Sequence, residues 1–171
     1  MPLTVRPIPT LDDRINDIRM RTAEIVNGDI LPNERNLWHS AHGGAVETEP
    51  SVIDAKALRE EIKQKVRKAG LWAPHLPQEY GGMGLDFLAH AYMNEVLAYA
   101  MGAAALFGVV APNSGNQTIL LKYGTPEQKE QWLRPLVEGE MESGFSMTEP
   151  ENPAPAGDGA VPADPGAAAS D

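Results

Sequence analysis

The chain has 171 residues, contains no cysteine and carries a formal net charge of −10. Its length suits one domain with a real core, and the missing thiols exclude disulfide scaffolds, thiolate zinc sites, iron–sulfur clusters and thiol catalysis. An acidic chain without clustered Lys and Arg is a poor match for nucleic acid. The first nine residues lack the charged-then-apolar build of a secretory signal, so we expect a cytoplasmic protein.

The first helix is predicted to begin at Thr10, with Asp13 completing a short capping box. Asn27 and Gly28 are predicted to end it. Apolar residues recur along one face of this segment, at Leu11, Ile15, Ile18 and Ile25.

A second helix is predicted from Ser51, where Asp54 stands at the third position. Gly70 is expected to end this helix, because glycine readily takes the left-handed conformation found after a helix. Its apolar residues follow at intervals of three and four, at Ala55, Leu58, Ile62, Val66 and Ala69.

Residues 96–112 carry no charged side chain, which raises the possibility of a membrane span. The alanines, the glycines and the closing Pro112 favour two buried helical segments broken near Gly102 instead. Residues 86–101 and 113–123 are predicted to be helical.

The last predicted helix has the strongest start signal. Thr125 is an N-cap candidate, Pro126 suits the first turn, and Gln128 stands at the capping-box position. Pro135 is expected to bend or shorten this helix.

Two loops separate the helices, at residues 40–50 and 73–85. Residues 81–84 read Gly-Gly-Met-Gly. They follow a proline-rich loop and lack the Gly-Lys-Ser/Thr ending of a phosphate loop, so we interpret them as a turn.

No set of three converging metal ligands is identifiable, so no metal site is assigned. The four histidines are interpreted as ordinary surface or capping residues: His39, His42, His75 and His90.

Beyond Gly139 the pattern changes. Residues 144–148 alternate apolar and polar side chains, which is typical of a short strand. In residues 151–171, 14 of 21 side chains are Ala, Pro or Gly, so this tail is expected to be disordered. We therefore predict an all-α class: a helical domain at 1–140, the start of a β domain at 141–150, and the tail.

Three groups of residues are candidates for chemistry. Glu95 lies in an otherwise apolar helix, where a half-buried carboxylate suits either a general base or a structural ion pair. Asn113 and Gln117 belong to a polar cluster that either caps a helix or faces a ligand. Phe145 and Thr148 lie on the predicted strand, where they suit either a flat ring or an ordinary sheet edge.

Several stretches, in this order and spacing, resemble the amino-terminal helical domain of the acyl-CoA dehydrogenase family. They are residues 70–84, 94–99, 123–129 and 139–150. The similarity extends over about residues 10–153 and implies FAD as cofactor and an acyl-CoA thioester as substrate. Relatives oxidise the bond between the α and β carbons, transfer electrons to a partner and form homo-oligomers.

The resemblance implies roles for six residues. By position, Phe145, Met147 and Thr148 match the strand that lies against the flavin. Glu95, Asn113 and Gln117 match, more loosely, the side where the acyl chain lies.

The resemblance fades at Asn152-Pro153, and the β domain, the second helical domain and the catalytic carboxylate have no counterpart. We therefore expect no catalytic residue in this chain, a truncation or frameshift of a longer reading frame, and no activity for the chain alone. The alternative is a helical binding module that acts with a second chain or without flavin.

Overall fold

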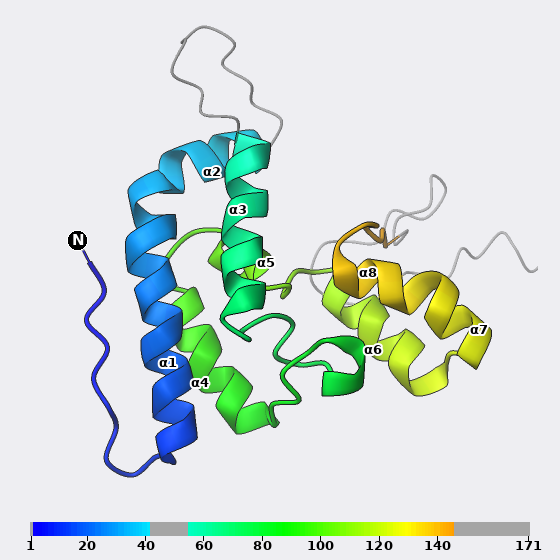
Figure 1. The fold of residues 1–171 in the computed structure, drawn as a ribbon, viewed down its shortest axis with the longest axis horizontal. Coiled ribbons are helices and arrows are strands. Elements are labelled where there is room, and N and C mark those ends of the chain that lie inside the picture. Colours follow the sequence, from blue (N-terminus) through cyan, green and yellow to red (C-terminus); the bar gives the residue numbers. More distant parts are fainter. Residues whose placement is uncertain (1, 42–54, 146–171) are drawn as a thin grey trace, which may run out of the picture.

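The computed structural model describes residues 2–41 and 55–145. Within these ranges every regular element is helical, and the all-α prediction is confirmed. The helices form two groups that lie side by side (Figure 1). The first group contains α1 (Asp13–Ile25), α2 (Glu34–Ala41), α3 (Ala55–Lys68), α4 (Phe87–Leu97) and α5 (Ala103–Leu106). The second contains α6 (Asn113–Tyr123), α7 (Pro126–Gln128) and α8 (Arg134–Glu138).

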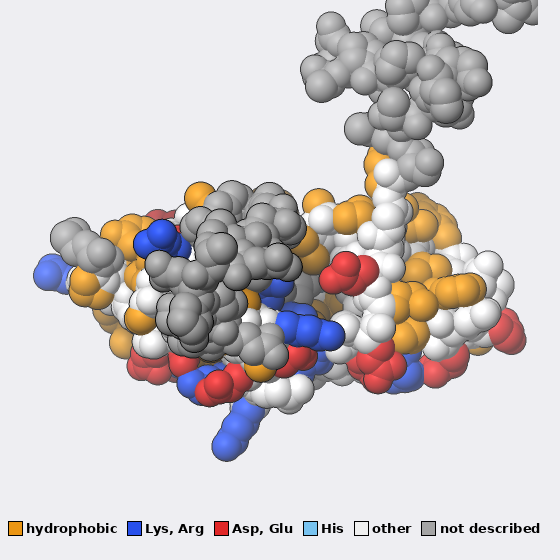
Figure 2. Space-filling model, turned by 90° about the horizontal axis from the view of Figure 1, so that it is seen from above, with side chains coloured by type: hydrophobic (Ala, Val, Ile, Leu, Met, Phe, Trp, Pro, Cys, Tyr) orange, Lys and Arg blue, Asp and Glu red, His pale blue; other side chains and the backbone are white. Residues whose placement is uncertain are grey.

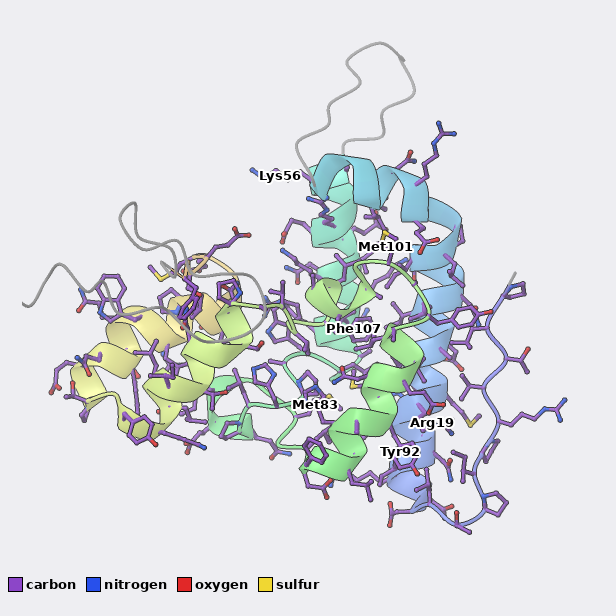
Figure 3. All side chains as sticks on the ribbon, turned by 180° about the vertical axis from the view of Figure 1, so that it is seen from behind. Arg19, Lys56, Met83, Tyr92, Met101 and Phe107 are labelled. Carbon is purple, nitrogen blue, oxygen red and sulfur yellow. The ribbon has the colours of Figure 1, made fainter. Side chains whose placement is uncertain are left out.

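The hydrophobic core lies mainly in the first group, where α1 packs on α4 and α3 packs on α2 and α5. Phe107, between α5 and α6, is completely buried and lies centrally among these helices (Figure 3). Apolar side chains from every helix of the group surround it, including Ile18, Leu37, Ile62, Val66, Met93 and Val96. Burial of this apolar surface is what stabilises the group, at about 25 cal/mol per Å².

The predicted start of α1 at Thr10 is wrong by two residues. Asp12 is the N-cap, and its carboxylate accepts the backbone N–H of Arg14 at 2.7 Å. Thr10 instead belongs to a turn in which the N–H of Leu11 donates to the carbonyl of Ile8.

The predicted end at Asn27 and Gly28 is also wrong. The helical path continues through a π-turn, η1 (Val26–Ile30), and a 3₁₀ turn, η2 (Leu31–Asn33), into α2. Asn27 does not stop the helix because its side chain bonds elsewhere: it pairs with both the N–H and the carbonyl of Leu3. The amino-terminal segment is thereby held against α1.

The other helix boundaries follow local signals more closely. Gly70 has a φ of 68°, as its predicted role after α3 requires. Gly102, at 72°, separates α4 from α5, which confirms the predicted break in the uncharged stretch. Asp86 caps α4 by accepting the N–H of Ala89 at 2.8 Å. No helix of the described residues is long and apolar enough to cross a membrane.

The capping box at Thr125 is confirmed. Its hydroxyl accepts the N–H of Gln128 at 3.3 Å, and the Gln128 side chain accepts the N–H of Thr125 at 2.9 Å. A π-turn, η4 (Lys129–Leu133), then precedes Pro135 in α8. The wider turn accommodates a proline ring that would clash with the preceding turn of a regular α-helix.

Replacing Thr125 with Ala is expected to lower the free energy of unfolding by about 1 kcal/mol, because the N–H of Gln128 loses the hydroxyl that accepts its hydrogen bond. Chemical denaturation followed by circular dichroism measures the change. Thr125→Ser keeps the hydroxyl and should lose less than half as much; equal losses in the two variants would show that the cap contributes nothing.

Several predictions fall on residues that the structure does not describe. These are the start at Ser51, nearly all of the loop at 40–50, the strand residues 146–148 and the tail at 151–171. Gly144 and Phe145 are described and are not part of a strand.

Candidate functional site

A cavity of about 420 Å³ lies where α3 and α5 face α6 and the segment after α8. Most of its wall is apolar and includes Trp72, Leu106, Val110, Leu136 and Met141. Amide side chains of Asn113 and Gln117 contribute the polar part, and Arg59, Lys63 and Glu142 contribute the charges. An apolar enclosure with a few fixed polar groups is the usual build of a small-molecule site.

Gln117 is the best-fixed polar group of this wall. Its side chain is almost fully buried, with 3% exposed. Its Nε2 donates to the carbonyl of Leu136 at 3.1 Å, and its Oε1 lies 3.0 Å from Nε2 of His75. The side chain therefore joins α6, α8 and the loop before α4.

Asn113 binds the segment that follows α8. Its Oδ1 accepts both the backbone N–H and the hydroxyl of Ser143, at 2.9 and 2.8 Å. Asn116 donates to the same hydroxyl at 2.9 Å. These bonds hold residues 141–144 beside α6. Ser143 lies in the stretch 139–150 that resembles the family, but its partners are 27 and 30 positions away and could not be predicted from neighbouring residues.

Trp72 connects the two helical groups at the cavity. Its indole N–H donates to the carbonyl of Val137 at 2.9 Å. The guanidinium of Arg67 stacks 3.7 Å from the indole ring and donates to the carbonyl of Glu138 at 2.7 Å. Burial lowers the pKa of Arg67, but its ordinary value is so high that the side chain stays charged.

The charged residues of the cavity have partners of their own. Lys63 pairs with Glu60 at 2.8 Å, one turn back on α3. Arg59 donates to the carbonyl of Leu37 at 2.7 Å. Arg59 therefore joins α3 to α2 as well as lining the cavity, whereas the ion pair of Lys63 stays within α3.

Glu95 is not brought to the cavity. Its side chain is 64% exposed, and it pairs with the buried Arg19 of α1 at 3.8 Å. The expectation that Glu95 is half-buried, which rested on its apolar neighbours in sequence, is therefore wrong. Glu95 lies on the outward face of α4. Figure 3 shows Arg19 beside Tyr92, whose ring lies 5.8 Å from the guanidinium.

Phe145 lies at the end of the described chain with 70% of its surface exposed. Met147 and Thr148 lie outside the described residues. A shallow apolar groove of about 410 Å³ is formed nearby by Ile119, Trp132 and Met141. Hydrophobic side chains gather on this part of the surface, over α6 to α8 (Figure 2).

Two histidines were interpreted wrongly. His75 and His90 are partly buried and stack with ring centroids 5.9 Å apart, so they are not ordinary surface residues. Within the described residues, no three His, Asp or Glu side chains are close enough together to hold a metal ion.

The amino-terminal domain of acyl-CoA dehydrogenases matches residues 16–140, which is more than half of the chain. The chain belongs to the acyl-CoA dehydrogenase family. It is 36% identical over 137 residues to the probable acyl-CoA dehydrogenase FadE2 of Mycobacterium tuberculosis, covering 78% of this chain and 31% of that protein.

A second relative is 3-(aryl)acrylate reductase of Clostridium sporogenes. It is 39% identical over 90 residues, which is 53% of this chain and 24% of that protein. A solved structure assigned as an acyl-CoA dehydrogenase of Mycobacterium abscessus matches with a TM-score of 0.69 and 34% identity, covering 82% of this chain and 35% of the other. The chain thus spans about a third or less of the length of these relatives.

Proposed function

We propose that this domain forms part of an FAD-dependent acyl-CoA dehydrogenase and that its cavity beside Gln117 receives the acyl chain. The observation that carries the proposal is the cavity itself, which has a largely apolar wall and one buried amide, Gln117, within it. Family membership supports a dehydrogenase-type function. Leu106, Val110 and Leu136 would contact the alkyl chain and keep water from it.

The flavin part of the proposal rests on a partial fit. Phe145 is exposed two residues after Ser143, which lines the apolar groove, and an exposed aromatic side chain suits one face of a flat ring. Met147 and Thr148 complete the proposed cofactor contacts by their place in the sequence. When bound, FAD would supply the hydride acceptor for α,β-dehydrogenation. No residue of this chain is proposed as the catalytic base, and activity is proposed to need further domains.

Three further properties are proposed for the whole protein: a homo-oligomer, an electron-transfer partner and a cytoplasmic location. Glu95 keeps only a weak case as a substrate-side residue, because it pairs with Arg19 away from the cavity.

The acyl-chain proposal is tested by titrating the purified chain with octanoyl-CoA and with free CoA by calorimetry. Each buried methylene adds about 0.8 kcal/mol, so octanoyl-CoA should bind at least about tenfold more tightly. Ala105 lines the cavity, and Ala105→Phe should abolish the difference by filling it. Ala91→Phe, at an exposed position of α4, is the matched control and should keep it. Equal affinities for the two ligands would contradict the proposal.

A second function is favoured by the exposed groove at Ile119, Trp132 and Met141. It is a helical binding module that acts with a second chain or without flavin. Incubation with FAD, removal of free cofactor and a visible absorption spectrum distinguish the two. A retained flavin spectrum supports the dehydrogenase proposal, whereas a protein that retains no flavin supports the module.

A further inference from the structure

A pair of histidines connects the first helical group to the wall of the cavity. His75 lies in the loop between α3 and α4, and His90 lies on α4. Their rings stack at 5.9 Å with an angle of 20° between planes. His75 in turn contacts Gln117 of α6, whose amide reaches α8 through Leu136. Met83, labelled in Figure 3, lies in the same loop between the groups.

The hydrogen bonds define which nitrogen of His75 carries the proton. A carbonyl oxygen only accepts, so Gln117 must turn its Nε2 toward Leu136 and its Oε1 toward His75. His75 therefore donates from Nε2, 3.0 Å from that oxygen. In the neutral ring, Nδ1 then bears a lone pair and no proton.

The remaining buried nitrogens have no partner. His75 Nδ1 and His90 Nε2 are inaccessible to solvent and make no hydrogen bond to any described residue. A second proton on His75 would have to enter at Nδ1, where no acceptor receives it. Leaving a charged N–H buried and unpaired is costly.

Charged groups on the surrounding elements do not relieve this cost. Asp86 uses its carboxylate to cap α4, and Arg19 and Glu95 pair with each other. Burial is the largest influence and lowers the pKa of both histidines. For His75 the hydrogen bond to Gln117 acts on the pKa in the opposite direction, and like-charge repulsion from His90 adds to the lowering. No carboxylate among the described residues raises the pKa of either ring.

We propose that the stacked His75–His90 pair is a proton-sensitive contact that holds the two helical groups together only while both rings are neutral. Protonation of either histidine separates the rings and loosens the loop between α3 and α4, through which His75 supports Gln117. The cavity wall thereby becomes less ordered on mild acidification. This inference concerns the folded domain itself and holds whether or not the cavity binds an acyl chain.

The sign of the pH effect follows from linkage. In the unfolded chain both histidines have the ordinary pKa of about 6.5, whereas the folded state holds them lower. Below pH 6.5 the unfolded state therefore binds more protons than the folded state. The free energy of unfolding decreases as the pH is lowered, until the pH lies below the pKa values of the two histidines in the folded state. Above pH 7 the contribution is fully present.

The test is the thermal unfolding midpoint of the chain at pH 7.5 and at pH 5.5. We expect a fall of about 4 °C in the unmodified chain. The double variant H75Q/H90F should lose most of this fall, because the Gln amide replaces the Nε2–H donor and Phe keeps the stacking while neither titrates. The matched control H39Q/H42Q, at the two other histidines, should keep the fall.

A second measurement on the unmodified chain guards against a variant that does not fold. A long-range proton–nitrogen spectrum of the imidazoles should show His75 protonated at Nε2 and bare at Nδ1 at pH 7.5. Both rings should titrate below pH 6.5. Titration at or above that value, an Nδ1-protonated His75, or a pH-dependent midpoint that H39Q/H42Q removes would each overturn the proposal.

Discussion

Replacing Gly82 with Ala is expected to prevent folding, or to lower the free energy of unfolding by more than about 3 kcal/mol. A Cβ atom at this position would lie 2.6 Å from the carbonyl oxygen of Ala73, and closer still to that of Leu76. Both obstacles are backbone, so no side-chain rotation relieves the clash. The position requires glycine for space and not for an unusual φ.

The loop has little freedom to move away from the new methyl group. The N–H groups of Gly82 and Gly84 donate to the carbonyls of Pro77 and Leu76, at 3.1 and 2.8 Å. Met83 donates to Ala73 at 3.3 Å. Moving the loop would break these bonds and displace His75, which supports Gln117.

Urea denaturation followed by circular dichroism measures the effect. Gly115→Ala is the control, because a Cβ there meets nothing within 4 Å and the residue lies in α6. That substitution should raise stability by about 0.5–1 kcal/mol, since alanine loses less backbone entropy in a helix. Gly82→Ala should therefore lower the free energy of unfolding, whereas Gly115→Ala should raise it. Similar losses in both would refute the steric argument.

Replacing Trp72 with Ala is expected to lower the free energy of unfolding by about 4 kcal/mol. The indole ring is 7% exposed, packs against Gly108 and carries the Arg67 guanidinium on its face. Its removal leaves a void between the helical groups and leaves the carbonyl of Val137 without its donor. The loss thus combines a cavity with an unmade hydrogen bond.

Two further variants separate these contributions. Trp72→Phe keeps most of the ring volume but no N–H, so it should cost about 1–3 kcal/mol. Trp132→Ala removes a tryptophan that is 44% exposed and should cost clearly less than Trp72→Ala. The same urea titration ranks the three. An equal loss for Trp72→Ala and Trp132→Ala would show that the contact to Val137 does not join the groups.

The elements that the sequence predicted well are those specified by neighbouring residues. The capping box of Thr125 and Gln128 involves side chains three positions apart, and Gly70 and Gly102 act through their own backbone. Such signals are complete within one turn of chain. They predicted α3, α6 and the break between α4 and α5 without any knowledge of the tertiary fold.

The errors concern residues whose role depends on distant partners. Asn27 reads as a helix stop, yet Leu3, 24 positions earlier, takes up its side chain. His75 reads as an ordinary loop residue, yet Gln117 lies 42 positions later. Glu95 reads as half-buried because its neighbours in sequence are apolar, whereas the direction it faces depends on how α4 packs against α1.

The candidate site was predictable in part. Asn113 and Gln117 were singled out as a polar cluster, and both line the cavity. The cavity itself was not predictable, because its wall is assembled from α3, α5, α6 and the segment after α8. Trp72 and Ser143 lie in stretches that resemble the family, but their contacts to Val137 and Asn113 depend on residues 65 and 30 positions away.

The π-turn at Val26–Ile30 makes the number of residues between α1 and α2 a structural constraint. An α-helix turns by about 100° per residue, so removing one residue here would rotate α2 by about that angle relative to α1. Leu37, which is 5% exposed, would then turn away from its place in the core, and the next residue, Trp38, would take its position along the helix. A single deletion in this segment therefore turns a different side of the next helix toward the core, although no side chain of that helix has been replaced.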